Sequence, residues 1–190
     1  SVVVIDLDDF SIPVAISTPS ISANDLRDIS SLQYQDLLND PARPLFNRAF
    51  MGLYPPASTI KPLLTVFALN NGYTNWDETI FDDGFFRFEE EERVFNAWRE
   101  GGHGLTDLKK ALVESSNPFF MNLSIRYEKN LFVEFLKSSS FGSKLCEDCY
   151  PHQFSPLIDD DWKYKNFGKE LFKGDFINLG VGQGYMLTTP

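Results

Sequence analysis

The first residues alternate between apolar runs and a polar segment. Val2 to Ile5 and Ile12 to Ile16 are rich in β-branched side chains, and Asp8 to Ser11 lie between them. Such runs on either side of a short polar stretch are typical of two paired strands, so we expect a β-hairpin. Residues 17–57 lack sustained periodicity, and we expect an irregular excursion there with a short helical piece near Leu32 to Leu38.

Helical periodicity begins near the middle of the chain. Apolar residues recur at helical spacings from Ser58 to Asn71, and Gly72 is suited to end that helix. Thr106-Asp107 predicts the start of another helix, which ends at the polar corner Ser115-Ser116-Asn117. Pro118 cannot continue that helix but suits the first turn of the next, so we expect a helix, a tight corner and a second helix.

The other segments complete a mixed pattern. Residues 77–98 predict short strands around an exposed acidic run, and Asn130 to Lys137 predicts an amphipathic helix. Residues 143–175 look rich in loops, and Phe176 to Leu179 looks like a strand before the glycine-rich turn Gly180 to Gly184. We therefore expect an α/β fold of the mixed α+β kind, in which helices pack on a sheet.

Composition and charge limit the classes of protein to which the chain could belong. The chain has 190 residues, 43% of them hydrophobic, which describes a packed globular chain. Its 27 acidic and 17 basic side chains give a formal net charge of −10, and the basic residues form no stripe, so nucleic acid is not an expected partner. The longest apolar stretch, Leu63 to Leu69, falls far short of the ~18 residues that span a bilayer.

The sharpest chemical motif is Ser58 followed three residues later by Lys61. If a helix begins at Ser58, both side chains lie on one face, and the amine can reach the hydroxyl. A lysine kept neutral by burial can take the proton of a serine nucleophile, and the helix N-terminus supplies N–H groups for an oxyanion. The alternative is coincidence, because about one such pair is expected in a chain of this size.

A second candidate is the corner Ser115-Ser116-Asn117, where Ser115 could relay a proton and Asn117 could hold a substrate amide. The alternative is a capping cluster before Pro118. Ser22-Ala23-Asn24 has the same three-residue pattern without a helical context, so the triplet alone has little specificity.

The ordered motifs together resemble a family. The segment from Asn39 through Tyr54-Pro55-Pro56-Ala57-Ser58-Thr59-Ile60-Lys61-Pro62 is similar to the approach to the active serine in class B penicillin-binding proteins, especially the elongation-type members. The later motifs follow at matching separations: Trp98, Gly102-His103-Gly104, Ser115 to Asn117, Gly174-Asp175 and Gly182 to Tyr185. The resemblance covers nearly the whole chain.

The resemblance implies a penicillin-recognising transpeptidase fold and a serine D,D-transpeptidase that cross-links peptidoglycan stem peptides during cell elongation. Ser58 would form the acyl-enzyme, Lys61 would act as base, Ser115 would shuttle a proton, and Asn117 would bind substrate. β-Lactams would acylate Ser58, and no cofactor is implied. The implied partners are a RodA-type glycosyltransferase and MreC, and the implied location is the periplasmic face of the bacterial inner membrane.

Three departures from the family pattern change these expectations. Ala57 stands where Gly is common, and Asn117 is closer to the division-type pattern. The third motif, Lys-Thr-Gly or a variant, is absent from these residues, and Thr188-Thr189-Pro190 looks like the start of a helix. We therefore expect residues 1–190 to be a partial transpeptidase domain, incomplete at the C-terminus, with anchor and pedestal elsewhere, and the isolated segment to be inactive.

Asp82 and His103 correspond to two ligands of a zinc site in some relatives, but Ala97 and Ser116 occupy the other two positions. We expect no zinc there, because two ligands cannot build a closed tetrahedral site. For Cys146 and Cys149, a local disulfide, zinc binding with His152 and unpaired thiols all remain open.

Two other functions remain as alternatives: a division-type transpeptidase with the same chemistry, and a non-catalytic penicillin-binding-like interaction module.

Overall fold

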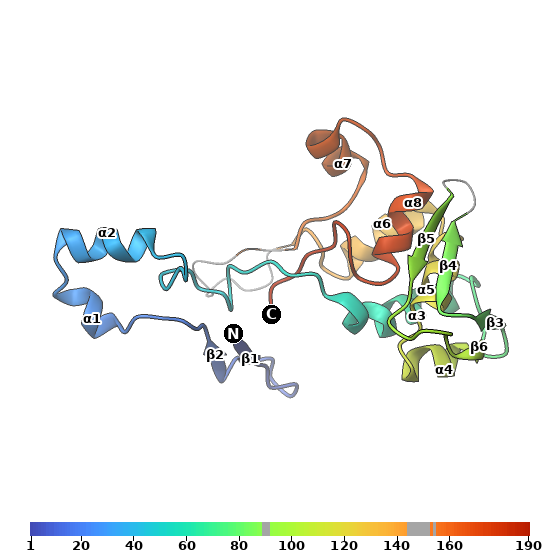
Figure 1. Cartoon of the computed structure of the whole chain (residues 1–190), viewed down its shortest axis with the longest axis horizontal. Helices are drawn as coiled ribbons and strands as arrows, with labels where there is room; N and C mark the ends of the chain where they lie inside the picture. Colours follow the sequence, from blue (N-terminus) through green and yellow to red (C-terminus); the bar gives the residue numbers. More distant parts are fainter. Residues whose placement is uncertain (89–91, 144–152, 154) are drawn as a thin grey trace. The chain divides into compact units, whose positions relative to one another are not determined.

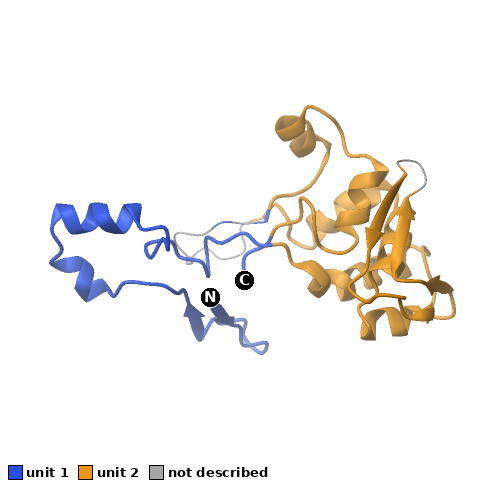
Figure 2. Cartoon of the chain, viewed as in Figure 1, with its two compact units in different colours: residues 1–54, 144–155, 188–190 blue, residues 55–143, 156–187 orange. Residues whose placement is uncertain are grey.

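The computed structural model describes residues 1–88, 92–143, 153 and 155–190. The chain forms two compact units (Figure 2): unit 1 contains residues 1–54, 144–155 and 188–190, and unit 2 contains residues 55–143 and 156–187. Figure 1 labels the helices and strands in chain order. All four residues proposed from sequence as catalytic or substrate-binding belong to unit 2.

Unit 1 begins with the expected hairpin. Strand β1 (Val2–Val4) pairs antiparallel with β2 (Val14–Ile16), and Val2 lies opposite Ile16. The helical piece expected near Leu32 to Leu38 is confirmed as α2 (Ser31–Asn39), which Ser30 and Gln33 begin with a capping box.

A further helix in unit 1 was not expected. Ser22 accepts a hydrogen bond from the Asp25 N–H and begins α1 (Ala23–Arg27). The interpretation of Ser22-Ala23-Asn24 as lacking a helical context is therefore wrong. A helix of five residues is too short to show apolar periodicity, so only its cap could reveal it.

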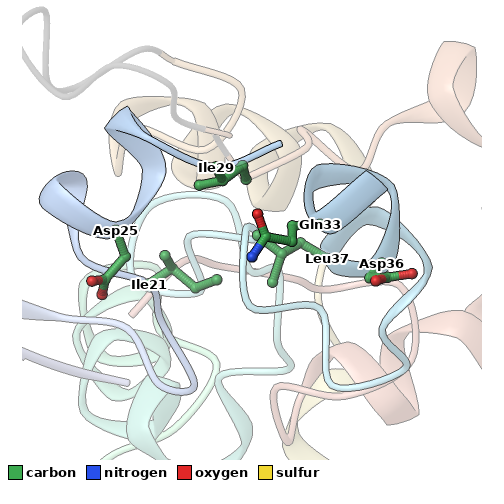
Figure 3. Close-up of a pocket in the computed structure, with 6 residues that line it drawn as sticks. All are labelled: Ile21, Asp25, Ile29, Gln33, Asp36 and Leu37. Atoms are coloured by element: carbon green, nitrogen blue, oxygen red, sulfur yellow. The ribbon is translucent and has the colours of Figure 1, made fainter. Parts of the chain in front are cut away.

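The helices of unit 1 and the residues beside them line an open pocket. Neither α1 nor α2 has a buried residue. The pocket has a volume of about 350 Å³ (Figure 3), and six side chains line it: Ile21, Asp25, Ile29, Gln33, Asp36 and Leu37.

In unit 2, the helix expected over Ser58 to Asn71 forms in two parts. A 3₁₀ turn, η1 (Ala57–Ile60), leads into α3 (Lys61–Asn70), with Pro62 in the first turn of α3. Gly72 follows with a φ of +70°, as expected of a residue that ends a helix.

The predicted helix–corner–helix is confirmed. Asp107 accepts a hydrogen bond from the Lys110 N–H and begins α4 (Leu108–Val113). Ser116 accepts a hydrogen bond from the Phe119 N–H and begins α5 (Asn117–Ser124). Helix α5 ends before Tyr127. The next helix, α6 (Lys129–Ser138), agrees with the expectation for Asn130 to Lys137.

The strands of unit 2 pair antiparallel. Strand β3 (Thr79–Asp82) pairs with β6 (Gly104–Asp107), and β4 (Phe85–Phe88) pairs with β5 (Arg93–Asn96). The expected strands within residues 77–98 are thus confirmed, whereas β6 was not expected. With the helices, they confirm the mixed α+β class.

One expectation for the last third of the chain is wrong. The described part of residues 143–175 contains α7 (Asp160–Phe167) between loops, whereas the strand expected at Phe176 to Leu179 lies within α8 (Lys173–Leu179). A short apolar run does not distinguish a strand from a buried helix, and here Phe176, Ile177 and Leu179 are buried as a helix face. Cys146, Cys149 and His152 lie outside the described residues.

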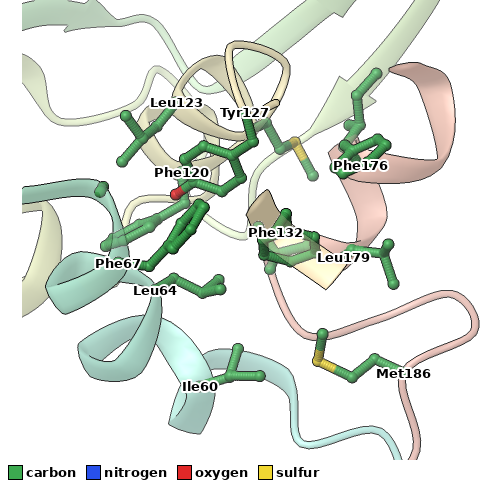
Figure 4. Packing of buried hydrophobic residues seen from close by; sticks show 14 of the residues in the cluster. Ile60, Leu64, Phe67, Phe120, Leu123, Tyr127, Phe132, Phe176, Leu179 and Met186 are labelled. Carbon is green, nitrogen blue, oxygen red and sulfur yellow. The ribbon is translucent and has the colours of Figure 1, made fainter. Parts of the chain in front are cut away.

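The hydrophobic core is in unit 2 (Figure 4). Phe67 of α3 makes edge-on contacts with Tyr127 and Phe132, at centroid distances of 4.9 and 5.5 Å. These rings pack α3 against residues that follow α5 and against α6. The core therefore holds α3 firmly, and with it the residues at its N-terminus. No helix among the described residues is long and apolar enough to cross a bilayer.

Candidate active site

Ser58 and Lys61 occupy the junction between η1 and α3. Ser58 is exposed in the 3₁₀ turn, whereas Lys61, the first residue of α3, is only 2% exposed. Residues three apart eclipse one another in a 3₁₀ turn, so the two side chains share a face. An exposed serine thus lies on the same face as a buried lysine.

The Lys61 amine is surrounded by three oxygen atoms of the distant corner. Its Nζ lies 2.8 Å from the Ser115 carbonyl oxygen, 3.1 Å from Ser115 Oγ and 2.8 Å from Asn117 Oδ1. Nζ also lies 5.3 Å from the centroid of the Phe120 ring. The two motifs singled out from sequence are therefore brought together by the fold.

The expected hydrogen bond between Ser58 and Lys61 is not formed. Among the hydrogen bonds of the described residues, none joins Ser58 Oγ to Lys61 Nζ. A charged amine has three N–H donors, and the three acceptors from Ser115 and Asn117 occupy all of them. The direct contact that the spacing predicted is thus replaced by contacts to the corner.

Burial changes the protonation of this amine. It lowers the pKa of Lys61 to about 8, because removal from water disfavours the ammonium form. About a tenth of the lysine is then neutral at pH 7. A neutral amine has two N–H donors and a lone pair, so Ser115 Oγ can donate to it while the Ser115 carbonyl and Asn117 Oδ1 still accept.

The residues of the corner differ in their hydrogen-bond partners. Ser115 has a φ of +55°, which turns Ser115 and Asn117 toward Lys61. Ser116 instead donates to Asp82 Oδ2 at 2.5 Å and accepts from the Phe119 N–H. The capping interpretation is therefore correct for Ser116, whereas Ser115 and Asn117 contact the amine.

Asp82 and His103 form a buried network with Ser116. His103 Nδ1 lies 2.8 Å from Asp82 Oδ2, and Asp82 Oδ1 accepts from the Gly84 N–H. Burial acts to raise the pKa of Asp82, but the hydrogen bonds from Ser116 and His103 outweigh it and hold the pKa below its ordinary value.

This network does not have the donors of a zinc site. It offers one carboxylate, one imidazole and a serine hydroxyl, whereas structural zinc takes four ligands from Cys, His, Asp and Glu. Among the residues that the structure describes, no group of three or more His, Cys, Asp or Glu side chains could hold a metal. His103 therefore acts here as a hydrogen-bonding partner of Asp82.

One contact behind Ser58 was missed from sequence. The Ala57 N–H donates to the Gly182 carbonyl oxygen at 2.8 Å, and Ala57 has a φ of +49°. The closely spaced glycines of residues 180–184 were the available signal, because such runs often mark a close approach of two backbones.

Comparison with known proteins identifies relatives of the chain. The chain is 38% identical to peptidoglycan D,D-transpeptidase MrdA of Haemophilus influenzae and 36% identical to that of Escherichia coli K12. Both alignments cover the whole chain but only 29% and 30% of those relatives. The chain thus spans about 30% of the length of these relatives.

The chain is also similar to solved structures of penicillin-binding proteins. The penicillin-binding protein PBP2 of Helicobacter pylori matches with a TM-score of 0.89 at 30% identity, over 99% of this chain and 36% of that chain. PBP2 in a complex with MreC from the same organism matches with a TM-score of 0.90, over 99% of this chain and 35% of that chain.

The sequence profile described as penicillin binding protein transpeptidase domain matches residues 1–190. With the relatives that are 38% and 36% identical, this match establishes that the chain belongs to the penicillin-binding protein transpeptidase family.

Proposed function

We propose that this chain is the serine-bearing part of an elongation-type peptidoglycan D,D-transpeptidase, with Ser58 as nucleophile. The observation that carries the proposal is the buried Lys61 amine, held by Ser115 and Asn117 beside an exposed serine. Kinship with MrdA proteins, at 38% and 36% identity, supports the elongation type.

In the first half-reaction, Ser58 Oγ attacks the carbonyl between the two terminal D-alanines of a stem peptide. Its proton passes to neutral Lys61, whose pKa of about 8 supports this role. The Oγ–C bond forms as the C–N bond to the last D-alanine breaks. That leaving amine takes a proton through Ser115 Oγ, which lies 3.1 Å from Lys61 Nζ.

In the second half-reaction, an amine of a neighbouring stem peptide attacks the Ser58 ester. A new amide forms, the C–Oγ bond breaks, and Ser58 regains its proton. The Ser58 N–H takes no part in the hydrogen bonds of the described residues and supplies one oxyanion donor. Asn117 binds the substrate backbone through its amide nitrogen, since Oδ1 already accepts from Lys61.

The same proposal assigns the partners and the surroundings of the site. β-Lactams acylate Ser58, and the enzyme cooperates with a RodA-type glycosyltransferase and with MreC. The PBP2–MreC complex among the similar structures, with a TM-score of 0.90, supports the last partner. The chain is one part of a longer protein, held at the periplasmic face of the inner membrane by an anchor outside residues 1–190.

A second function follows from one observation. Because no hydrogen bond joins Ser58 Oγ to Lys61 Nζ among the described residues, a non-catalytic interaction module is the competing proposal. Such a module would keep the fold without forming an acyl-enzyme. The division-type transpeptidase shares the chemistry and differs in its partners.

The intact mass of the complete protein after exposure to a β-lactam separates a transpeptidase from the interaction module. We expect a stable adduct of one drug molecule, lost in Ser58→Ala and retained in Ser22→Ala, whose serine lies outside the site. Rapid drug hydrolysis without an adduct indicates a β-lactamase. An unmodified protein with intact drug supports the interaction module.

A further inference from the structure

A second buried lysine, Lys163, belongs to neither motif of the candidate active site. Lys163 of α7 has a side chain with no exposed surface, although charged side chains are almost never fully buried without partners. Its Nζ lies 2.7 Å from Asp175 Oδ1 of α8 and 2.8 Å from the Tyr185 hydroxyl. We call Lys163, Asp175 and Tyr185 the lysine cluster.

Aromatic rings complete the surroundings of this amine. Nζ lies 4.0 Å from the centroid of the Tyr185 ring, and the rings of Phe167 and Phe172 lie 5.2 and 5.4 Å away. Burial acts to lower the pKa of Lys163, but the hydrogen bonds that its amine donates to Asp175 and Tyr185 outweigh this effect and hold the pKa above its ordinary value. The amine is thus a fixed cation rather than a base.

The cluster holds one end of the glycine-rich turn. Tyr185 directly follows Gly184, and the other end of the turn is fixed to α8, where Gly182 N–H donates to the Leu179 carbonyl and Gln183 N–H donates to Asn178. Asp175 also belongs to α8. By contacting both Asp175 and Tyr185, Lys163 connects the residue after the turn to the helix that precedes the turn.

The glycine-rich turn also contacts the backbone just before Ser58. Gly182 accepts from the Ala57 N–H at 2.8 Å. The approach is so close that a Cβ on Gly182 would clash with the Ala57 carbonyl oxygen. Ala57 has a φ of +49°, a conformation that costs of order 1 kcal/mol for alanine and persists only where neighbours enforce it.

We propose that Lys163, Asp175 and Tyr185 are positioning residues that hold Ala57 in its left-handed conformation, through the Gly182 turn, and thereby set the acylation rate of Ser58. The effect on acylation rests on the proposed function, whereas the effect on Ala57 does not. Among the described residues, the hydrogen bonds of the cluster involve neither Ser58 nor Lys61.

The test uses Tyr185→Phe in the complete protein, which removes one hydroxyl and keeps the ring. Tyr127→Phe is the matched control, because the buried Tyr127 hydroxyl has no hydrogen-bond partner among the described residues. Lys163→Met combined with Asp175→Asn is a second variant, which removes both buried charges together and so leaves neither unpaired.

Amide hydrogen exchange of the peptide around Ala57 gives the first readout. Pro55 and Pro56 carry no N–H, so the signal comes mainly from Ala57 and the turn after it. We expect exchange at least about threefold faster in Tyr185→Phe and unchanged in Tyr127→Phe, while exchange in α6 stays at its wild-type rate. Wild-type exchange around Ala57 in both cluster variants would overturn the inference.

The kinetics of β-lactam acylation give the second readout. We expect the acylation step to slow about tenfold in Tyr185→Phe, with drug binding before acylation changed less than about twofold. Ala57→Gly, which adopts a positive φ without strain, should restore most of this loss. A slowed step that Ala57→Gly does not restore would contradict the positioning role.

Hydrogen exchange and acylation kinetics together distinguish a failure of the proposed function from a failure of the positioning role. If wild-type protein forms no adduct but exchange around Ala57 responds to Tyr185→Phe, the proposed function fails and the contact between cluster and Ala57 stands. If the wild type is acylated and neither readout responds, only the positioning role is wrong.

Discussion

Lys61 Nζ lies 2.8 Å from Asn117 Oδ1, and this contact joins the first residue of α3 to the first residue of α5. The amine therefore lies where the N-termini of two helices meet. Helix N-termini disfavour positive charge, so they act in the same direction as the burial that lowers the pKa of Lys61 to about 8. The arrangement favours a neutral lysine, which is the form a general base requires.

The first prediction concerns pH. A protonated Lys61 cannot accept the Ser58 proton, so the acylation rate should rise as pH increases toward 8 and level off above it. Stopped-flow acylation with a chromogenic β-lactam between pH 6 and 10 measures the midpoint. Lys61→Met should remove the pH dependence along with most of the activity. A flat wild-type profile would contradict a titrating base at this position.

The second prediction changes the charge next to the amine. Asn117→Asp places a carboxylate 2.8 Å from Nζ, which favours the ammonium form and raises the pKa of Lys61. We expect the midpoint of the acylation profile to move up by about one pH unit or more, with slower acylation at pH 7. Asn117→Ser, which adds no charge, is the control. An unshifted midpoint in Asn117→Asp would mean that another group controls the profile.

The third prediction concerns the buried cap. Ser116→Ala removes the acceptor for the Phe119 N–H and a donor to Asp82, so the free energy of unfolding should fall by about 2 kcal/mol. Ser30→Ala removes the exposed cap of α2 and should cost about 1 kcal/mol or less. Urea denaturation of both variants gives the comparison. Equal losses would show that the buried network adds nothing to the cap.

The fourth prediction separates packing from helix formation in α3. Leu64 is fully buried, and Leu64→Ala should lower the free energy of unfolding by about 3 kcal/mol through the cavity it leaves. Val66, on the same helix, is 51% exposed, and Val66→Ala should change it by less than about 0.5 kcal/mol. Thermal unfolding of both variants tests this difference, and similar losses would contradict the core assignment.

Local signals in the sequence predicted much of the fold. The start of α4 at its Asp107 cap and the ends of the amphipathic helix α6 were predicted within one residue, because caps and periodicity act over one or two turns. The strand expected at Phe176 to Leu179 was wrong for the opposite reason. Four residues carry too little periodicity, and burial against the core decided their conformation.

For the site, the sequence by itself determined the chemistry that is local: a serine three residues before a lysine at a helix start, and a serine–asparagine corner before a proline. Only the tertiary structure decided that Lys61 bonds to a corner 54 residues away rather than to Ser58, and that its amine is buried enough to lose a proton near pH 8. Spacing along a helix fixes which side chains share a face, whereas the partners and solvation of an amine depend on what the rest of the chain packs around it.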